Sequence, residues 1–114
     1  KLQPNWKLTR LETWSLPGVP DVLILDQKST FQLVELKYTR TNAVRVSPHQ
    51  VSFLSAHSEG LVWLLVKRDP ISAAAQYYLY RGDAVMDVAM EGLMVEPYFL
   101  GDSIDSVIEL IATH

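Results

Sequence analysis

One short segment in the first quarter of the chain limits what it can fold into. Residues 17 to 20, Pro-Gly-Val-Pro, place two prolines and a glycine within four positions, so no helix continues across them. Val22 to Leu25 then forms a short, wholly apolar run, and Phe31 to Tyr38 follows a polar turn at residues 26 to 30. Runs of this length and composition predict two strands joined as a hairpin.

A capped helix is expected after the hairpin. Ser47 suits the N-cap, Pro48 suits the first helical position, and Gln50 completes the capping-box pattern. Gly60 is the expected left-handed C-cap residue, which would end this helix near Glu59.

The apolar spacing elsewhere predicts the remaining elements. Further strands are expected at Lys7–Trp14, Leu61–Lys67 and Gln76–Tyr80, the last at a sheet edge, and further helices at Ala84–Met90 and Ser103–Ala112. This order predicts an α/β (α+β) protein in which a mixed β-sheet is flanked by helices. A chain of 114 residues is the size of one domain, so we expect a single domain over residues 1–114.

The composition restricts the chemistry and the location. The chain has no cysteine, so disulfides, thiolate metal sites and cysteine nucleophiles are excluded, and any metal would be held by oxygen or imidazole. No apolar run approaches the roughly 18 residues of a membrane span, and no signal-peptide pattern is visible. We therefore expect a soluble, intracellular protein of the cytoplasm, or of the host cytoplasm if the chain is viral, without membrane partners.

The net charge of −3 hides two halves of opposite sign. Residues 1 to 68 hold nine basic and five acidic groups, a net +4, whereas residues 69 to 114 hold one basic and eight acidic groups, a net −7. A polyanion would be attracted to the first half and repelled by the second. The alternative is two solvated faces that merely differ in sign.

The hairpin places three charged side chains together. If residues 27 to 29 form a three-residue loop, Asp21 lies opposite Glu35, with their Cβ atoms about 5 Å apart. Lys37 is two residues beyond Glu35 and shares its face, while Leu36 points to the other face. Two facing carboxylates need a neutralising cation, which a structural ion network or a bound metal could supply.

A hard divalent cation suits this arrangement. Mg²⁺ needs only one or two carboxylates plus water and substrate phosphate oxygens, and it can polarise a phosphoryl oxygen and lower the pKa of a bound water. An adjacent lysine can orient that water or stabilise developing charge. The pattern therefore indicates phosphodiester hydrolysis.

Gly18-Val19-Pro20-Asp21, Glu35-Leu36-Lys37 and Gln50 together resemble the PD-(D/E)XK nuclease superfamily, and more narrowly its small VRR-NUC and Holliday-junction-resolvase-like branches, over roughly residues 10 to 68. The resemblance implies a restriction-endonuclease-like fold. It also implies that Asp21, Glu35 and the backbone carbonyl of Leu36 bind Mg²⁺ or Mn²⁺, and that Lys37 serves the attacking water.

Two further positions are candidates by the same resemblance. Gln50 matches a helix glutamine near the nuclease site, although the capping box alone explains that residue. Many members carry a glutamate on an N-terminal helix, and Glu12 is the candidate upstream, in a segment that reads as a strand.

These features predict a metal-dependent endonuclease that cuts branched or junction DNA, and a homodimer that uses the apolar stretches Ala84–Met94 and Val95–Leu100. The basic and polar residues expected to contact the DNA backbone are Arg40, Arg45, His49, Lys67 and Arg68. The alternatives are an exonuclease or restriction-type enzyme, an inert nucleic-acid-binding module of the same fold, and a protein-interaction domain whose acidic tail binds a basic partner. No small-molecule cofactor is expected.

Overall fold

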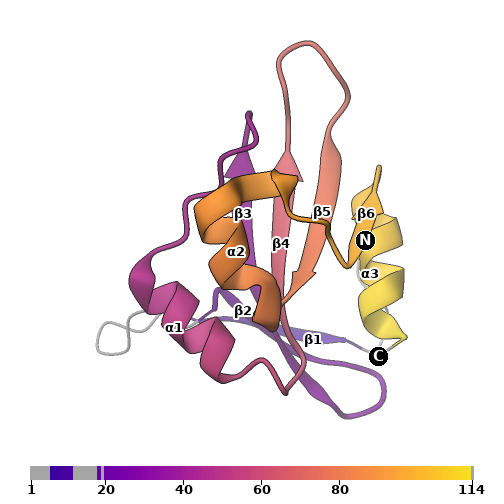
Figure 1. Cartoon of the computed structure of the whole chain (residues 1–114). Coiled ribbons are helices and arrows are strands. Elements are labelled where there is room, and N and C mark those ends of the chain that lie inside the picture. Colours follow the sequence, from indigo (N-terminus) through magenta and orange to yellow (C-terminus); the bar gives the residue numbers. More distant parts are fainter. Residues whose placement is uncertain (1–5, 12–17, 19, 114) are drawn as a thin grey trace.

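The computed structural model describes residues 6–11, 18 and 20–113. Within them, six strands form one mixed sheet in the order of the chain (Figure 1). These strands are β1 Lys7–Arg10, β2 Val22–Leu25, β3 Phe31–Thr39, β4 Val62–Arg68, β5 Gln76–Arg81 and β6 Phe99–Gly101. β3 and β4 are parallel, and the other neighbours are antiparallel. The predicted α/β (α+β) architecture, a mixed sheet flanked by helices, is confirmed.

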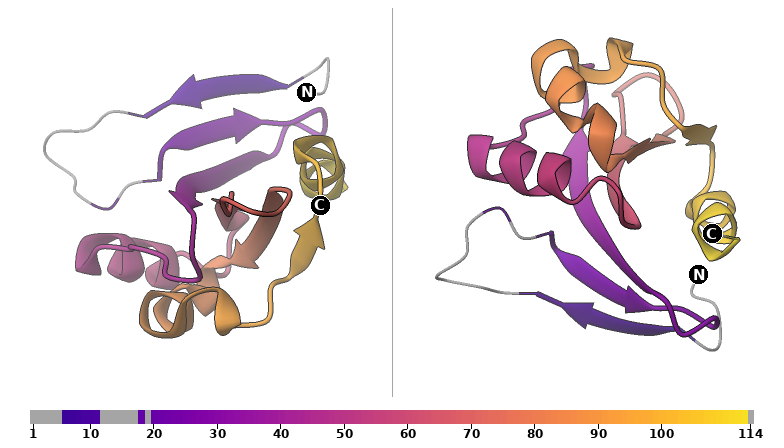
Figure 2. Two further views of the ribbon diagram at one scale, coloured as in Figure 1. Left: turned by 90° about the horizontal axis from the view of Figure 1, so that it is seen from above. Right: turned by 60° about the horizontal axis from the view of Figure 1, so that its bottom comes forward.

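Helices cover the two faces of the sheet (Figure 2). α1 Pro48–Ala56 joins β3 to β4, and α2 Val85–Glu91 lies beside it between the 3-10 turns η1 Gly82–Ala84 and η2 Gly92–Met94. α3 Ile104–Ala112 packs on the opposite face. None of the helices in the described ranges is long and apolar enough to span a bilayer.

Each face has its own apolar core, because side chains along a strand alternate between faces. Leu64 and Val66 of β4 point toward α1 and α2, where Leu54 and Val88 meet them. On the other face Trp63 of β4 belongs to the core that α3 completes. The face of each residue on β3 and β4 follows from this alternation.

The hairpin has the predicted register. Val22 lies opposite Val34 and Leu25 opposite Phe31, while the Asp26 N–H donates to the Thr30 carbonyl at 3.0 Å across the three-residue loop. Residue 29 in this loop is Ser29, whose φ of 61° is the left-handed conformation that such a loop needs. The same register places Asp21 and Glu35 just beyond the last strand pair.

Several element predictions are corrected. β5 is not an edge strand, because β6 pairs with it on its outer side. α1 ends at Ala56 rather than near Glu59, and Gly60 does not have a positive φ. The chain leaves the helix at His57, whose ring nitrogen Nδ1 lies 2.7 Å from the Phe53 carbonyl oxygen and so caps it.

The first predicted strand, Lys7–Trp14, is shorter in the structure. β1 covers Lys7–Arg10, and residues 12 to 14 lie outside the described part of the chain.

Candidate active site

Strand β3 outruns its neighbour β2 and leaves room for a site. β2 pairs only with residues 31 to 34 of β3, so the second half of β3 has β4 on one side and Asp21 on the other. There the Leu36 N–H donates to Asp21 Oδ2 at 3.0 Å, a side-chain bond in place of a ladder bond. The N–H and C=O of one strand residue leave on the same side, so the Leu36 carbonyl also faces the side of Asp21.

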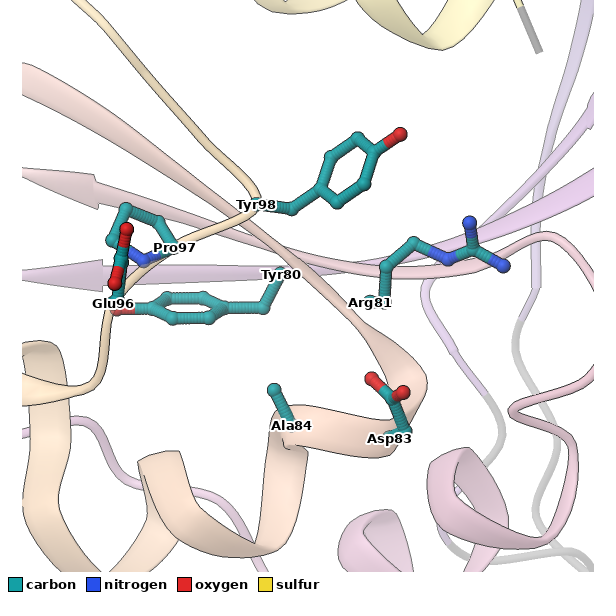
Figure 3. A pocket seen from close by; sticks show the side chains of 7 residues that line it. All are labelled: Tyr80, Arg81, Asp83, Ala84, Glu96, Pro97 and Tyr98. Carbon is teal, nitrogen blue, oxygen red and sulfur yellow. The ribbon is translucent and has the colours of Figure 1, made fainter.

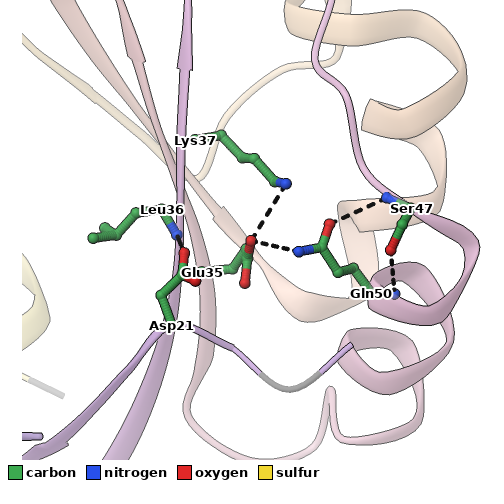
Figure 4. Close-up of polar contacts among 6 residues, drawn as sticks. All are labelled: Asp21, Glu35, Leu36, Lys37, Ser47 and Gln50. Atoms are coloured by element: carbon green, nitrogen blue, oxygen red, sulfur yellow. Dashed lines mark hydrogen bonds and ion pairs between the residues drawn. The ribbon is translucent and has the colours of Figure 1, made fainter. Parts of the chain in front are cut away.

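Glu35 is the centre of the site (Figure 4). Its side chain is 2% exposed, and Oε2 accepts a 2.7 Å hydrogen bond from Gln50 Nε2 and lies 3.4 Å from Lys37 Nζ. The other oxygen, Oε1, is buried and has no hydrogen-bond partner among the described residues. Buried polar atoms in native proteins usually have a hydrogen-bond partner, so this oxygen is the atom of the site at which a bound ligand would supply the missing contact.

The electrostatics of Glu35 oppose its ionised form. Burial raises the pKa of Glu35 to about 7, and the charge of Asp21 adds to the increase. Lys37 and the hydrogen bond from Gln50 act in the opposite direction. A cation beside Oε1 would shift this balance toward the carboxylate.

Gln50 has both roles that the sequence left open. Its backbone N–H donates to Ser47 Oγ at 3.1 Å and its Oε1 accepts the Ser47 N–H at 3.1 Å, which is a complete capping box. Its amide nitrogen is then free to point at Glu35. The start of α1 therefore fixes one donor of the site.

A glycine brings the segment that carries Asp21 against α1. Gly18 has a φ of +92°, and a Cβ atom there would lie 2.3 Å from the His49 carbonyl oxygen. Pro20, between Gly18 and Asp21, is fully buried. The sequence shows Gly18 only as part of a motif, because its contact with the first turn of α1 is set by the tertiary fold.

The donor set fits one hard divalent cation. Asp21, Glu35 Oε1 and the Leu36 carbonyl would supply oxygen ligands to such an ion, and Mg²⁺ or Mn²⁺ would complete its shell with water and substrate oxygens. No cluster of three or more His, Cys, Asp or Glu suited to a metal occurs among the residues that the structure describes. Glu12, the other predicted ligand, lies outside those residues.

The predicted DNA contacts do not all share the face of Glu35. His49 is exposed on the first turn of α1, and Arg45 is exposed on the segment before it. Arg68 occupies the same face as Glu35 by strand alternation, and its Nε donates to the Thr41 carbonyl at 3.1 Å. Lys67 lies on the opposite face, and Arg40 follows the end of β3 beside Tyr38. Lys67 and Arg68, two of the four residues predicted to line one groove, therefore lie on opposite faces of the sheet, and the DNA contacts themselves stay a prediction.

A separate hollow of about 530 Å³ lies at the far end of β5 (Figure 3). The Arg81 guanidinium there lies 5.0 Å from the centre of the Trp63 ring and 5.9 Å from that of Tyr98. Asp83 and Glu96 also line this hollow, so a phosphate would meet two acids. We do not assign it to the Glu35 site.

Comparisons with known proteins give one structural likeness of note. No family model matches the chain, and a search of curated proteins finds no match. Among solved structures, the chain is similar to Hjc, a Holliday junction resolvase from the archaeal hyperthermophile Archaeoglobus fulgidus. The identity is 19% and the TM-score 0.43, and the match covers 95% of this chain and 84% of that chain.

Proposed function

We propose that the chain is a divalent-metal-dependent nuclease that hydrolyses DNA phosphodiester bonds. The buried Oε1 of Glu35 carries the proposal, because it lacks a hydrogen-bond partner among the described residues and lies on a carboxylate beside Asp21. Leaving a buried charged acceptor unsatisfied costs about 1–3 kcal/mol or more, and a cation shared with Asp21 removes that cost. In a purely structural ion network, a buried carboxylate oxygen would be expected to accept a hydrogen bond from the protein.

Each side chain around Glu35 has a separate role in the proposed hydrolysis. A bound Mg²⁺ or Mn²⁺ supplies Lewis acidity toward a phosphoryl oxygen and a water of lowered pKa. Lys37, 3.4 Å from Glu35 Oε2 and 22% exposed, orients the attacking water and neutralises charge that develops on the phosphate. Gln50 holds the Glu35 carboxylate through Oε2, which leaves Oε1 for the cation. The Leu36 N–H fixes Asp21 in the same way.

We propose branched or junction DNA as the substrate and a homodimer as the active form. A domain of 12.9 kDa offers little surface for duplex DNA, and two copies double the footprint with two active sites. Within the predicted interface stretch 84 to 94, Met86, Met90 and Met94 are exposed and supply apolar surface. Sedimentation velocity of the purified chain, alone and with a four-way junction, tests this form directly.

Cleavage of supercoiled plasmid and of end-labelled branched and linear DNA tests the activity. We expect cleavage with Mg²⁺ or Mn²⁺, none with EDTA, and losses of at least 100-fold in Glu35→Gln and Lys37→Ala. Glu59→Gln removes an exposed acid next to α1 and serves as the control, with unchanged cleavage.

Metal binding gives a second, independent result. Mn²⁺ should raise the melting temperature of the wild-type chain and leave that of Glu35→Gln unchanged. A chain that binds DNA but neither cleaves it nor responds to Mn²⁺ would be an inert nucleic-acid-binding module, and the proposal would be wrong. Equal cleavage by wild type and Glu35→Gln would overturn the assignment of the site.

A further inference from the structure

Two tyrosines and a lysine form a row across the face of the sheet that Glu35 does not occupy. Tyr38 of β3 lies beside Lys67 of β4, and Lys67 lies beside Tyr77 of β5 in the register of the sheet. Tyr38 is 56% exposed, and Leu36, two residues before it on the same face, is 48% exposed. We call Tyr38, Lys67 and Tyr77 the Tyr-Lys-Tyr row.

Helix α3 leaves the Tyr38 end of this row open, while Tyr77 is half-buried against the core that α3 completes. The α3 side chains Val107, Ile108 and Ile111 pack in the core that contains Leu65, the β4 residue two positions before Lys67. Beyond that core the sheet surface forms a hollow of about 300 Å³. Its lining consists of Leu36, Lys37, Tyr38, Leu65, Lys67, Tyr77 and Ile104.

The charge of this surface suits a polyanion. No acid lines the hollow, and Lys67 Nζ stands 5.8 Å from the centre of the Tyr77 ring. Lys37 also borders the hollow, but its ammonium lies on the other face of the sheet, beside Glu35. Arg40 lies beside the Tyr38 hydroxyl, which donates to Asp69 at 3.0 Å. An aromatic face flanked by cations binds the two parts of a nucleotide at once, since bases stack on the rings and phosphates pair with the cations.

We propose that the Tyr-Lys-Tyr row binds unpaired bases of a single-stranded DNA segment, such as the arm or gap of a branched substrate. The inference rests on the proposed nuclease function. A second copy of the chain is a poorer occupant, because a two-fold contact through this face would bring Lys67 toward its own equivalent. Duplex DNA offers no free base faces to the rings.

The edge of β3 connects the row with the Glu35 site. Lys37 points to the site and Tyr38, the next residue, to the row, so the two surfaces lie back to back on one strand. No β2 residue pairs with this part of β3 in the described structure, since the register of β2 stops at Val34. A single strand bound on the row therefore passes around this edge to present a phosphodiester to Glu35.

Binding of a fluorescent oligo-dT of 20 nucleotides in EDTA tests the Tyr-Lys-Tyr row without any need for catalysis. We expect Tyr38→Ala and Tyr77→Ala each to weaken binding about tenfold, because stacking of one base contributes roughly 1–3 kcal/mol. Tyr38→Phe keeps the ring and should bind within about twofold of wild type. Lys67→Ala should reduce the slope of log affinity against log salt by about 0.7, the value for one phosphate of a single strand.

Phe31→Ala is the matched control, because Phe31 is an aromatic residue of the same strand, 62% exposed, near its other end. Its binding should equal that of wild type. Equal binding by wild type, Tyr38→Ala and Tyr77→Ala would overturn the row, while metal-dependent cleavage that is lost in Glu35→Gln would still support the nuclease. If binding depends on both tyrosines but the chain does not cleave DNA, the row is supported as a DNA site and the nuclease function is wrong. A dimer that dissociates in Tyr38→Ala would also overturn the row as a DNA site.

Discussion

Gln50 Nε2 lies 2.7 Å from Glu35 Oε2, and the amide oxygen of the same side chain accepts the N–H of Ser47. One glutamine thus closes the capping box of α1 and holds the central carboxylate of the site. Because both partners are fixed, the rotamer of Gln50 is set by the helix and in turn sets that of Glu35. The two roles can be separated by comparing substitutions at positions 47 and 50.

We expect Ser47→Ala and Gln50→Ala to lower the free energy of unfolding by similar amounts, about 1 kcal/mol each, since each removes part of the capping box. Only Gln50→Ala also removes the donor to Glu35, so only this variant should lose cleavage, by about tenfold. Urea denaturation and plasmid cleavage measure the two effects. Equal cleavage by the two variants would show that the Gln50 contact with Glu35 has no role in the reaction.

The pKa of Glu35, raised to about 7 from 4.5, makes stability depend on pH. A carboxyl group whose folded-state pKa is raised stabilises the fold fully below its unfolded pKa of 4.5 and loses that contribution as the pH rises through about 7. In EDTA, we therefore expect Glu35 to lower the free energy of unfolding by up to about 3 kcal/mol between pH 4.5 and pH 8. Glu35→Gln should abolish this part of the pH dependence.

Urea denaturation of wild type and Glu35→Gln at pH 5 and pH 8 provides the measurement. The difference between the two proteins should change with pH, with the variant gaining relative to wild type at pH 8. A difference that is the same at both pH values would mean that Glu35 ionises near its ordinary pKa.

Substitution by alanine is expected to destabilise the protein at Gly18 and to have almost no effect on its stability at Gly60. At Gly18 the φ of +92° and the 2.3 Å approach to the His49 carbonyl oxygen leave no room for a Cβ atom, so Gly18→Ala should lose about 2 kcal/mol or more. It should also weaken metal binding, because the loop that carries Asp21 must shift. At Gly60 the nearest atom to a Cβ would be 3.5 Å away, so Gly60→Ala should be nearly neutral. Thermal denaturation with and without Mn²⁺ compares them.

The buried side chain of Gln32 joins the hairpin to α3. Its Oε1 accepts the Trp63 indole N–H at 2.7 Å, and its Nε2 donates to Asp26 at 2.8 Å and to the Ile111 carbonyl at 3.2 Å. Gln32→Met keeps the volume but leaves buried groups unsatisfied, so we expect a loss of about 3 kcal/mol in urea denaturation. Thr9→Met, at an exposed position of β1, should cost under about 1 kcal/mol. Similar losses in both would argue against the buried network.

The sequence predicts the convergence of Asp21, Glu35 and Lys37 because strand alternation and one loop length determine it. The side on which Lys67 lies could not be predicted, since it depends on the parallel register that pairs Glu35 with Leu64. β6 has three residues, too few for a visible alternation. Gly60 is a plausible C-cap by residue type, but α1 ends at Ala56, where the backbone N–H and the ring Nδ1 of His57 both lie within hydrogen-bond distance of the Phe53 carbonyl oxygen.

Asp21→Asn should have opposite effects on two measured quantities: it should raise the stability of the metal-free protein and abolish the stabilisation by Mn²⁺. The asparagine oxygen can still accept the Leu36 N–H, so the loop keeps its anchor, whereas the loss of charge removes a cause of the raised pKa of Glu35. A lower pKa for Glu35 means that its ionisation costs less in the folded state, so at pH 8 in EDTA the variant should unfold at higher urea concentration than wild type. Saturating Mn²⁺ should then stabilise wild type but not the variant, because one of two carboxylate ligands is gone. If Mn²⁺ stabilised both proteins equally, Asp21 would not be a ligand, and the cation would have to lie elsewhere on Glu35.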